Sequence, residues 1–455
     1  MKLLLVTWYF PPANTIGAVR MGKFAKYLSR RGVDFRVLTG RDWGLPETLP
    51  LEIDPALIHQ ARWRDLNELP GPARTLRDWL KRRGQPVQGM LPPISSADKG
   101  LPSDEIVPKG TVIVQRMSAL YRDIVNFPDR QVAWAPYALS AARKLFRGWR
   151  PDLIYASVPP YTSLFVADIL ARRYDIPWVA EYRDRWCDDP YSVMPRWRAW
   201  LEHRLERRMM ESAAGIVTVS EPWAELYRAK YGRPTRAVLN GYDPEDVPDP
   251  APQAEPGPVR IVYTGAIYPG KRDPSPLFAA LARRPDLGKE VRVEFYGTKP
   301  EHVLPLAAQA GVRDQIAVHA GVPFRRSLAL QHAADVLLLM QWNDPREQGN
   351  VPAKLFEYMA TGRPILGIGI EDGVPARLID ARGAGIYAND PDRIAAQLGR
   401  WVEEKRATGR VTPVDPAARI GLARDEQFDT LLGFLETLLA QPLPAAAAKP
   451  EAGLV

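Results

Sequence analysis

The chain is poor in cysteine and histidine. Cys187 is the single cysteine among 455 residues, and the five histidines show no metal-ligand spacing. An intrachain disulfide and a cysteine-based zinc site are therefore excluded. Chains without disulfides are typical of reducing compartments, so we expect a cytoplasmic protein with no metal site.

The apolar start of the chain is short. Its run from Leu3 to Phe10 ends at Pro11 and Pro12, which is too short for a membrane span. The run predicts a first β-strand rather than a signal peptide. Apolar residues nevertheless make up 46% of the sequence, which supports a soluble globular protein, and 455 residues favour two domains over one.

The charge balance has no acidic excess. The formal net charge is +8, which favours anionic partners such as nucleotide phosphates, acidic lipid headgroups or nucleic acid. The arginines are scattered among acids, however, and no nucleic-acid module pattern is present. We therefore expect no nucleic-acid partner.

The first residues also lack a dinucleotide-binding fingerprint. A strand at 3–9, a loop at 10–20, a helix at 21–31 and a strand at 35–39 form the start of a nucleotide-binding α/β domain, but no GxGxxG follows the first strand. The predicted loop carries Gly17, which would allow a ligand to approach the backbone closely. An ordinary turn glycine is the alternative.

Strand and helix patterns alternate in both halves of the chain. Strands predicted at 259–264, 291–296 and 316–320 restart the rhythm of the first half. Such alternation is typical of parallel sheets covered by helices. The sequence therefore predicts an α/β fold with two doubly wound, Rossmann-like domains that face each other across a cleft.

The domain boundaries are predicted from composition. Residues 243–258 are rich in proline and acids, can bury almost nothing and predict a linker, whereas residues 403–439 look helical with a polar kink at 408–415. The predicted division is 1–240 for the first domain with a mobile proline-rich insertion at about 84–110, 241–258 for the linker, 259–415 for the second domain, 416–440 for a C-terminal helix that could pack back on the first domain, and 441–455 for a disordered tail.

One stretch of the second half predicts an anion site. A continuous apolar strand at 335–342 is followed by a polar loop at 343–351 and a helix that begins at Pro352 and stops at Gly362. Free N–H groups at the helix start would point to the carboxyl edge of the sheet, where α/β proteins bind phosphates. The alternative is a surface helix with a solvated pair of Lys354 and Glu357.

A second basic loop follows the strand at 259–264. Lys271 and Arg272 come shortly after Gly265, at the carboxyl end of that strand. Together with backbone donors at 349–351 they would form a clamp for a pyrophosphate. The alternative is a solvated charge pair.

Five segments resemble a known family. The chain is similar to the retaining GT-B glycosyltransferases of family four, especially the branch that makes bacterial surface polysaccharides. The segments are FPPANTIGAVRMGKFAKYL (10–28), AAGIVTVSEPW (213–223), LNGYD (239–243), YTGAIYPGKRDP (263–274) and NVPAKLFEYMATGRPIL (350–366).

The resemblance implies a GT-B fold, a nucleotide-sugar donor of UDP type, a glycan or lipid-linked acceptor bound by the first domain, and no cofactor. Lys271 would bind the donor diphosphate and Glu357 the donor ribose, and we predict these two as the catalytic residues. The predicted donor-binding residues are Gly17, Gly265, Arg272, Gly297, Val322, Gly349, Asn350, Val351 and Lys354.

The sequence departs from the family pattern at three places. The first of two glutamates spaced eight apart is replaced by Gly349, with Glu347 two residues too early, and the common arginine after the first glycine is Ala266. The family's histidine in the first domain is not apparent at 158–162. A non-catalytic protein that binds a nucleotide-sugar or a polyanion is therefore the alternative function.

The acceptor side is predicted from an acidic and aromatic run at 183–190, which follows a strand predicted at 177–182. Asp184 and Trp186 are the acceptor-side candidates, with helix capping or pairing with arginines as the alternative for the acids. Basic helices predicted at 74–83 and 196–208 suggest peripheral contact with an anionic membrane, although solvated surface helices are the alternative.

Overall fold

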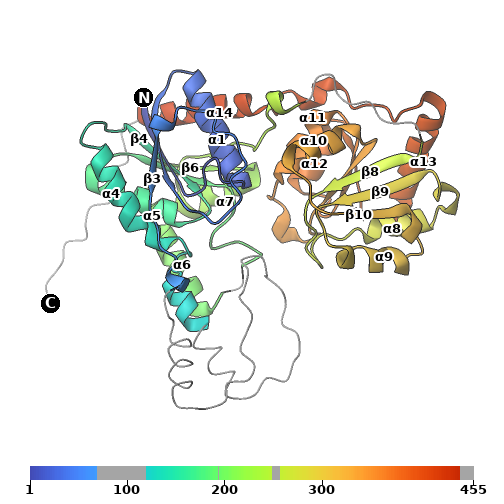
Figure 1. Cartoon of the computed structure of the whole chain (residues 1–455), viewed down its shortest axis with the longest axis horizontal. Coiled ribbons are helices and arrows are strands. Elements are labelled where there is room, and N and C mark those ends of the chain that lie inside the picture. Colours follow the sequence, from blue (N-terminus) through green and yellow to red (C-terminus); the bar gives the residue numbers. More distant parts are fainter. Residues whose placement is uncertain (69–118, 193, 248–256, 441–455) are drawn as a thin grey trace, which may run out of the picture. The chain divides into compact units, whose positions relative to one another are not determined.

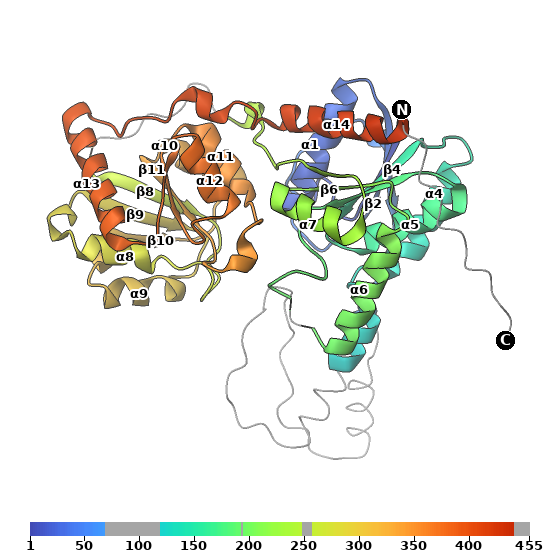
Figure 2. The same cartoon turned by 180° about the vertical axis from the view of Figure 1, so that it is seen from behind.

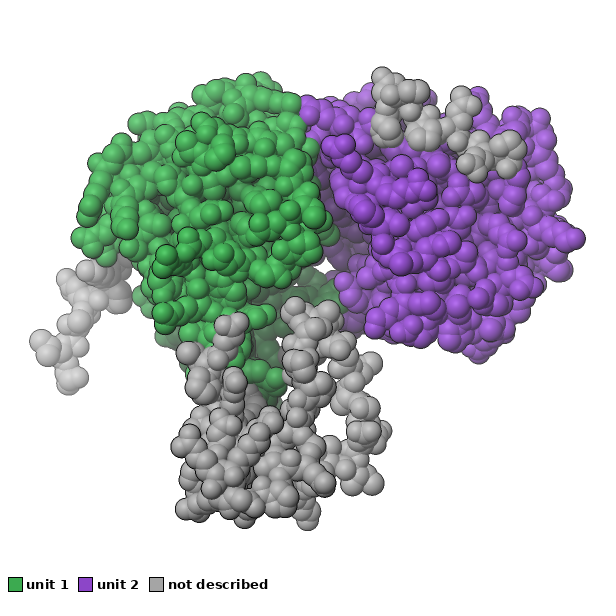
Figure 3. Space-filling view, in the orientation of Figure 1, with its two compact units in different colours: residues 1–213 green, residues 214–455 purple. Residues whose placement is uncertain are grey.

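The computed structural model describes residues 1–68, 119–192, 194–247 and 257–440 (Figure 1). The chain divides into two compact units, Met1–Ala213 and Ala214–Val455 (Figure 3). The predicted insertion at 84–110, the basic helix at 74–83 and the tail at 441–455 lie outside the described residues.

The first sheet has seven strands in the order β3-β2-β1-β4-β5-β6-β7, and every strand pair with a recorded register is parallel. The strand order reverses between β1 and β4. The strands are β1 Lys2–Thr7, β2 Asp34–Gly40, β3 Ile58–Ala61, β4 Leu153–Val158, β5 Trp178–Tyr182, β6 Gly215–Thr218 and β7 Thr235–Ala237. The helices of this part are α1 Ile16–Arg30, α4 Ala135–Leu145, α5 Thr162–Tyr174, α6 Arg196–Met210 and α7 Glu221–Tyr231.

The second sheet has six parallel strands in the order β10-β9-β8-β11-β12-β13. Its strand order reverses between β8 and β11, so a crevice is expected at the carboxyl ends of these two strands. The strands are β8 Val259–Thr264, β9 Val291–Tyr296, β10 Ile316–His319, β11 Val336–Met340, β12 Ile365–Ile368 and β13 Gly385–Tyr387. The helices of this part are α8 Ser275–Ala282, α9 Leu304–Gln309, α10 Phe324–Ala333, α11 Ala353–Thr361, α12 Val374–Ala381 and α13 Pro391–Thr408. Helix α14 Arg424–Ala440 packs instead on strand β6 of the first sheet, where a Cβ atom added to Gly215 would lie 2.6 Å from Leu438 Cδ1.

Helices cover both faces of the second sheet (Figure 2). Successive residues of a strand point to opposite faces. Accordingly, Leu338 of β11 joins an apolar cluster with residues of α8 and α13, whereas Leu337 and Leu339 join a cluster with residues of α11 and α12. The prediction of two doubly wound parallel sheets is confirmed.

The start of α1 differs from the prediction. The helix begins at Ile16 rather than at residue 21, because the hydroxyl of Thr15 accepts a hydrogen bond from Ala18 N and caps the first turn. Gly17 therefore lies in the first helical turn and not in a loop.

In the helical stretch predicted at 403–439, the break is longer than the predicted polar kink at 408–415. The structure has two helices here, because α13 ends at Gly409, which adopts a left-handed conformation with φ of 77°, and α14 begins only at Arg424. The region at 45–68 contains the short strand β3, which pairs with β2 in parallel.

Candidate functional site

Glycines line the carboxyl edge of the second sheet next to the point of strand reversal. Gly265 follows β8 and donates its N–H to Tyr296 O at 2.8 Å, and Gly297 follows β9 and donates to His319 O at 3.1 Å. Their φ angles of 127° and 88° are in the region that favours glycine. At these two positions the edge therefore presents backbone without a side chain.

Lys354 reaches from α11 to this edge. Its Nζ donates to Thr264 O at 2.7 Å and lies 4.2 Å from the ring centroid of Tyr263. Burial lowers the pKa of Lys354, and the nearby Arg272 lowers it further, whereas Tyr263 opposes the shift. The contact with Thr264 excludes a fully solvated Lys354–Glu357 pair.

Gly265 makes the room that Lys354 occupies. A Cβ atom added to Gly265 would lie 2.7 Å from Lys354 Nζ. Gly265→Ala should therefore lower the free energy of unfolding by about 1–3 kcal/mol, through backbone strain and displacement of the ammonium group.

Urea denaturation checks this effect, with Gly433→Ala in α14 as the control. A Cβ atom at Gly433 meets no atom within 4 Å, and alanine is the better helix former by about 1 kcal/mol, so this control should be as stable as the parent or more stable. Equal stability of Gly265→Ala and the parent would show that Lys354 does not depend on the space at Gly265.

Glu357 lies one turn further along α11 and is half-buried. Gln331 of α10 donates through Nε2 to Glu357 Oε2 at 3.3 Å and to Thr264 Oγ1 at 3.1 Å. Burial raises the pKa of Glu357, while the Gln331 hydrogen bond and the charges of Arg424 and Lys354 oppose this shift. The carboxylate is placed to accept a hydrogen bond from a hydroxyl group at the sheet edge.

Lys271 and Arg272 occupy the loop after β8 but point to different partners. Lys271 Nζ lies 4.6 Å from the ring centroid of Trp342, two residues beyond the end of β11. Arg272 donates through Nη1 to Ala266 O at 2.9 Å, and its guanidinium lies 4.7 Å from the ring centroid of Tyr268. Lys271 thus spans from the β8 loop to the β11 loop, and Arg272 stabilises its own loop.

The β11 loop adds further charges beside Lys271. Arg346 lies 4.5 Å from the ring centroid of Trp342 and donates to Asp344 through Nη2 at 2.7 Å. The Arg346 hydrogen bonds lower the pKa of Asp344 to about 2, with a smaller contribution from Lys271. Asp344 is therefore ionised at neutral pH, and its charge balances part of the cationic surface.

The segment 349–351 is held by hydrogen bonds from several directions. The hydroxyl of Ser220 donates to Gly349 O at 2.6 Å, and the side chain of Gln341 donates to Asn350 O at 3.0 Å. Val351 is buried. The N–H of Asn350 donates to Glu347 O at 2.8 Å, so this amide is engaged within its own loop, and donor binding by the backbone of 349–351 stays a prediction.

Glu347 is turned into the protein. Its side chain is 1% exposed, and Oε2 accepts from Asn350 Nδ2 at 2.6 Å. In this loop conformation Glu347 therefore organises segment 349–351. It does not replace the glutamate that the family pattern has at position 349.

Removal of the Glu347 carboxylate should loosen this loop. Glu347→Ala leaves the Asn350 amide without its acceptor, so the free energy of unfolding should fall by about 1–3 kcal/mol in urea denaturation. Glu301→Ala, at a side chain that is 65% exposed, should change it by less than about 0.5 kcal/mol. Equal effects of the two substitutions would show that Glu347 has no such role.

Two further predicted donor-binding residues, Val322 and Gly17, come from other parts of the chain. Val322 is half-buried and follows β10. Gly17 belongs to the first unit, where the guanidinium of Arg183 packs on it: an added Cβ would lie 1.9 Å from Arg183 Nη1. Arg183 also donates to Pro159 O at 2.5 Å, so the space over Gly17 is filled by a side chain of the same unit.

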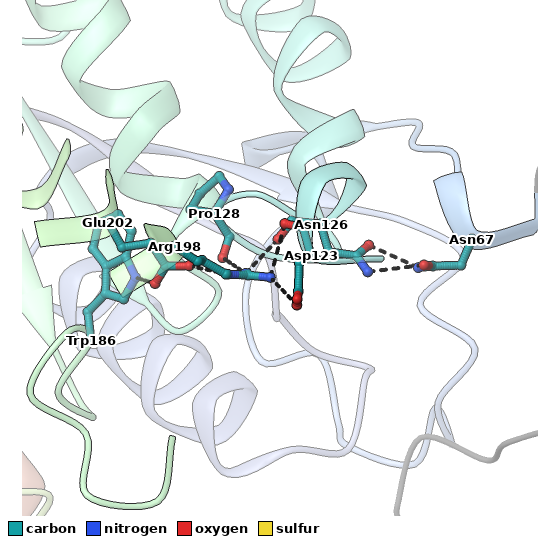
Figure 4. A network of polar contacts seen from close by, with 7 residues as sticks. All are labelled: Asn67, Asp123, Asn126, Pro128, Trp186, Arg198 and Glu202. Atoms are coloured by element: carbon teal, nitrogen blue, oxygen red, sulfur yellow. Dashed lines mark hydrogen bonds and ion pairs between the residues drawn. The ribbon is translucent and has the colours of Figure 1, made fainter. Parts of the chain in front are cut away.

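The acceptor-side candidates differ in exposure. Asp184 is exposed, whereas Trp186 is 2% exposed, stacks on Tyr161 with ring centroids 4.6 Å apart, and donates through Nε1 to Glu202 at 2.8 Å. Arg198 donates to the same carboxylate at 2.6 Å (Figure 4). The indole of Trp186 is thus tied to α6.

Sequence reasoning missed three side chains that shape this edge. Gln331, Trp342 and Arg424 each contact a predicted residue or shift its pKa, yet all come from other elements or loops. A glutamine in the mostly apolar stretch LALQHAADVLLLM was the one available signal. In the described parts of the chain, no group of three or more His, Cys, Asp or Glu residues could hold a metal ion.

The chain has two parallel sheets, each with one reversal of strand order, and the second sheet has basic side chains at its carboxyl edge. These features define the class: an α/β protein of the GT-B fold. HepE from Anabaena, crystallised with UDP, is 14% identical, superposes with a TM-score of 0.57, and the match covers 96% of this chain and 100% of that chain. The lipopolysaccharide outer core galactosyltransferase WaaB in its apo form is 12% identical with a TM-score of 0.55, over 96% of this chain and 99% of that chain. The GT-B prediction is confirmed.

Sequence comparison gives the family of one part of the chain. Residues 17–243 match the glycosyl transferase 4-like domain, so the chain carries such a domain. The 2-deoxystreptamine glucosyltransferase of Streptomyces kanamyceticus is 27% identical over 263 residues, which span 52% of this chain and 65% of that relative. Among the described helices, none combines the length and the apolar character that crossing a membrane requires.

Proposed function

We propose that this protein is a retaining glycosyltransferase that moves a sugar from a UDP-type nucleotide-sugar to a glycan or lipid-linked acceptor in cell-surface polysaccharide biosynthesis. The observation that carries the proposal is the gathering of Lys271, Lys354 and Glu357 at the carboxyl ends of the adjacent strands β8 and β11. The glycosyl transferase 4-like domain and the UDP bound to the structurally similar HepE support it.

In this mechanism the protein mainly stabilises charge. The leaving diphosphate would take the proton of the acceptor hydroxyl on the same face of the sugar, so the anomeric configuration is retained without two catalytic carboxylates. Lys271 would meet the negative charge that develops on the diphosphate. Glu357 would accept hydrogen bonds from the ribose hydroxyls, and Lys354 would hold the start of the β8 loop through Thr264 O. No metal or cofactor is needed in this scheme.

The proposed place of action is the cytoplasmic face of a membrane, where lipid-linked acceptors are found. The single cysteine and the net charge of +8 support this location.

Release of free nucleotide diphosphate tests the activity. The protein is screened by thermal shift against UDP-, GDP- and ADP-sugars, since a preferred donor raises the melting temperature by mass action. The preferred donor is then incubated with acceptor lipids or glycans, and free diphosphate is measured. Donor binding without any release would favour the non-catalytic alternative, which Gly349 and Ala266 motivate. The absence of any shift with all donors would contradict the transferase and any non-catalytic binding of a nucleotide-sugar.

A further inference from the structure

Helix α6 of the first unit separates its charges by burial. Its sequence RWRAWLEHRLERRMM contains five arginines and two glutamates. Both glutamates face the interior, because Glu202 is 2% and Glu206 is 0% exposed. Apart from the half-buried Arg198, the arginines are exposed. The exposed side of α6 therefore carries positive charge, and Glu211 at its C-terminal cap is an exposed acid just beyond the helix.

The same side of α6 exposes large apolar groups. Trp200 is 62% exposed, Trp197 39% and Leu201 36%. Residues at i, i+3, i+4, i+7 and i+11 of a helix share one face, so these three side chains lie on the same face as Arg204 and Arg208. The face opposes Glu202 and Glu206, and Arg207 borders it. We call this set the α6 surface: Trp197, Trp200, Leu201, Arg204, Arg207 and Arg208.

A second exposed apolar pair lies on a neighbouring helix. Leu120 and Ile124, one turn apart in the helical residues 119–125, are 50% and 59% exposed. Figures 1 and 2 both draw this helix beside α6. Apolar side chains are thus exposed on both members of a helix pair.

Arg198 fixes the two helices to each other. Its Nη2 donates to Asn126 O at 2.8 Å and to Pro128 O at 3.1 Å, and its Nη1 donates to Asp123 Oδ1 at 3.3 Å (Figure 4). The α6 surface is therefore a rigid feature of the first unit and does not need to fold on contact with a partner.

We propose that the α6 surface binds the headgroup region of an anionic lipid bilayer. Tryptophan is enriched at the membrane–water interface, and clustered arginines are attracted to anionic headgroups. Glu202 and Glu206 lie on the opposite face of α6, and Glu202 is paired with Arg198 at 2.6 Å, so the charged groups of the α6 surface itself are all positive. This surface would hold the proposed transferase at the membrane, and that role rests on the proposed function. Lipid binding itself needs no sugar transfer.

Vesicle flotation tests the proposal. The full-length protein is mixed with phosphatidylcholine vesicles, of which one set contains about one third phosphatidylglycerol and the other set contains none. Binding to each set is measured at low and at high salt. We expect binding to the anionic vesicles alone, weakened by salt. Trp200→Ser, and separately Arg204→Glu with Arg208→Glu, should each lower the partition coefficient by about tenfold or more.

A matched control separates local binding from net charge. Arg143→Glu with Lys144→Glu makes the same change of charge on exposed positions of α4, and this variant should bind vesicles more than the α6 double variant does. Equal losses in the two double variants, or no binding of the parent at low salt, would overturn the proposal. Self-association of the parent that is lost in Trp200→Ser, without vesicle binding, would assign the surface to a second copy of the chain and also overturn it.

The donor-induced thermal shift is measured on every variant. An unchanged shift in the α6 variants shows that they are folded and that the donor site is intact. A failure of lipid binding with a normal donor shift would refute the membrane inference alone, whereas an absent donor shift with normal lipid binding would refute the proposed transferase and leave this surface in place.

Discussion

Lys271→Ala should lower kcat/KM for sugar transfer by about a hundredfold or more while the protein stays folded. The ammonium group lies between the loops that follow β8 and β11, 4.6 Å from the Trp342 ring centroid. A cation fixed before the reaction stabilises charge that develops on a leaving diphosphate without reorganisation, so its removal raises the transition state by about 3 kcal/mol. Free diphosphate release under single-turnover conditions measures the effect.

Lys299→Ala provides the matched control for this loss. The side chain of Lys299 belongs to the same unit, is 70% exposed and lies 4.0 Å from Glu301. A weak surface pair of this kind is worth about 0–1 kcal/mol to stability, and its removal should leave transfer unchanged. Near-normal transfer by Lys271→Ala, or an equal loss in both variants, would count against the assigned role.

Glu357→Gln should also abolish most transfer, again by about a hundredfold or more in kcat/KM, mainly by weakening donor binding. The carboxylate accepts a hydrogen bond from Gln331 at 3.3 Å and is half-buried. Hydrogen bonds to a charged group contribute about 1.5–3 kcal/mol, so the loss of two from a ribose is sufficient for this effect. Donor KM and kcat, measured separately, check it.

The pH dependence gives a second measurement of Glu357. Burial raises its pKa above the ordinary value of 4.5, so the ionised form should be lost at a higher pH than for a solvated glutamate. Transfer should fall as the pH drops through this raised pKa. Because the Gln331 hydrogen bond lowers the pKa of Glu357, Gln331→Met should move the acidic limb of kcat/KM to higher pH. A limb that is the same in the parent, Gln331→Met and Glu357→Gln proteins would exclude Glu357 as its source.

Much of the second domain can be predicted from local patterns. The predicted strands at 259–264 and 291–296 have the observed bounds of β8 and β9, because each is a short stretch rich in β-branched and aromatic residues that ends beside a glycine. Helix α11 follows Pro352 and stops at Gly362, whose φ of 68° suits glycine. Adjacent parallel strands then bring the loop with Lys271 and the helix with Glu357 to one edge.

The misplaced helix ends have equally local causes. The predicted loop at 10–20 overlooked the cap that Thr15 provides, and the C-terminal helix predicted from residue 416 begins only at Arg424. Both errors come from reading apolar periodicity without its stop and start signals.

The contacts within the site could not be predicted in this way. Lys354 bonds to a carbonyl 90 residues earlier in the chain, and Gln331 lies 26 residues from the carboxylate that it contacts. Such pairs depend on the register of β8 against β11 and on the direction of each side chain, which no local pattern contains. The same applies to Glu347, whose inward turn toward Asn350 follows from the conformation of one loop.

The amino-acid sequence by itself determined the two parallel sheets, the glycine-lined edge and the residue types placed beside it, because hydrophobic periodicity and backbone preferences act between near neighbours in the chain. Only the tertiary structure decided that Lys354 donates a hydrogen bond to Thr264 O and that the N–H of Asn350 donates to Glu347 O. It also decided that α6 exposes tryptophan and arginine side chains and buries its glutamates. These outcomes depend on packing between elements that are distant in the chain, where burial and register select one partner among several of similar chemistry.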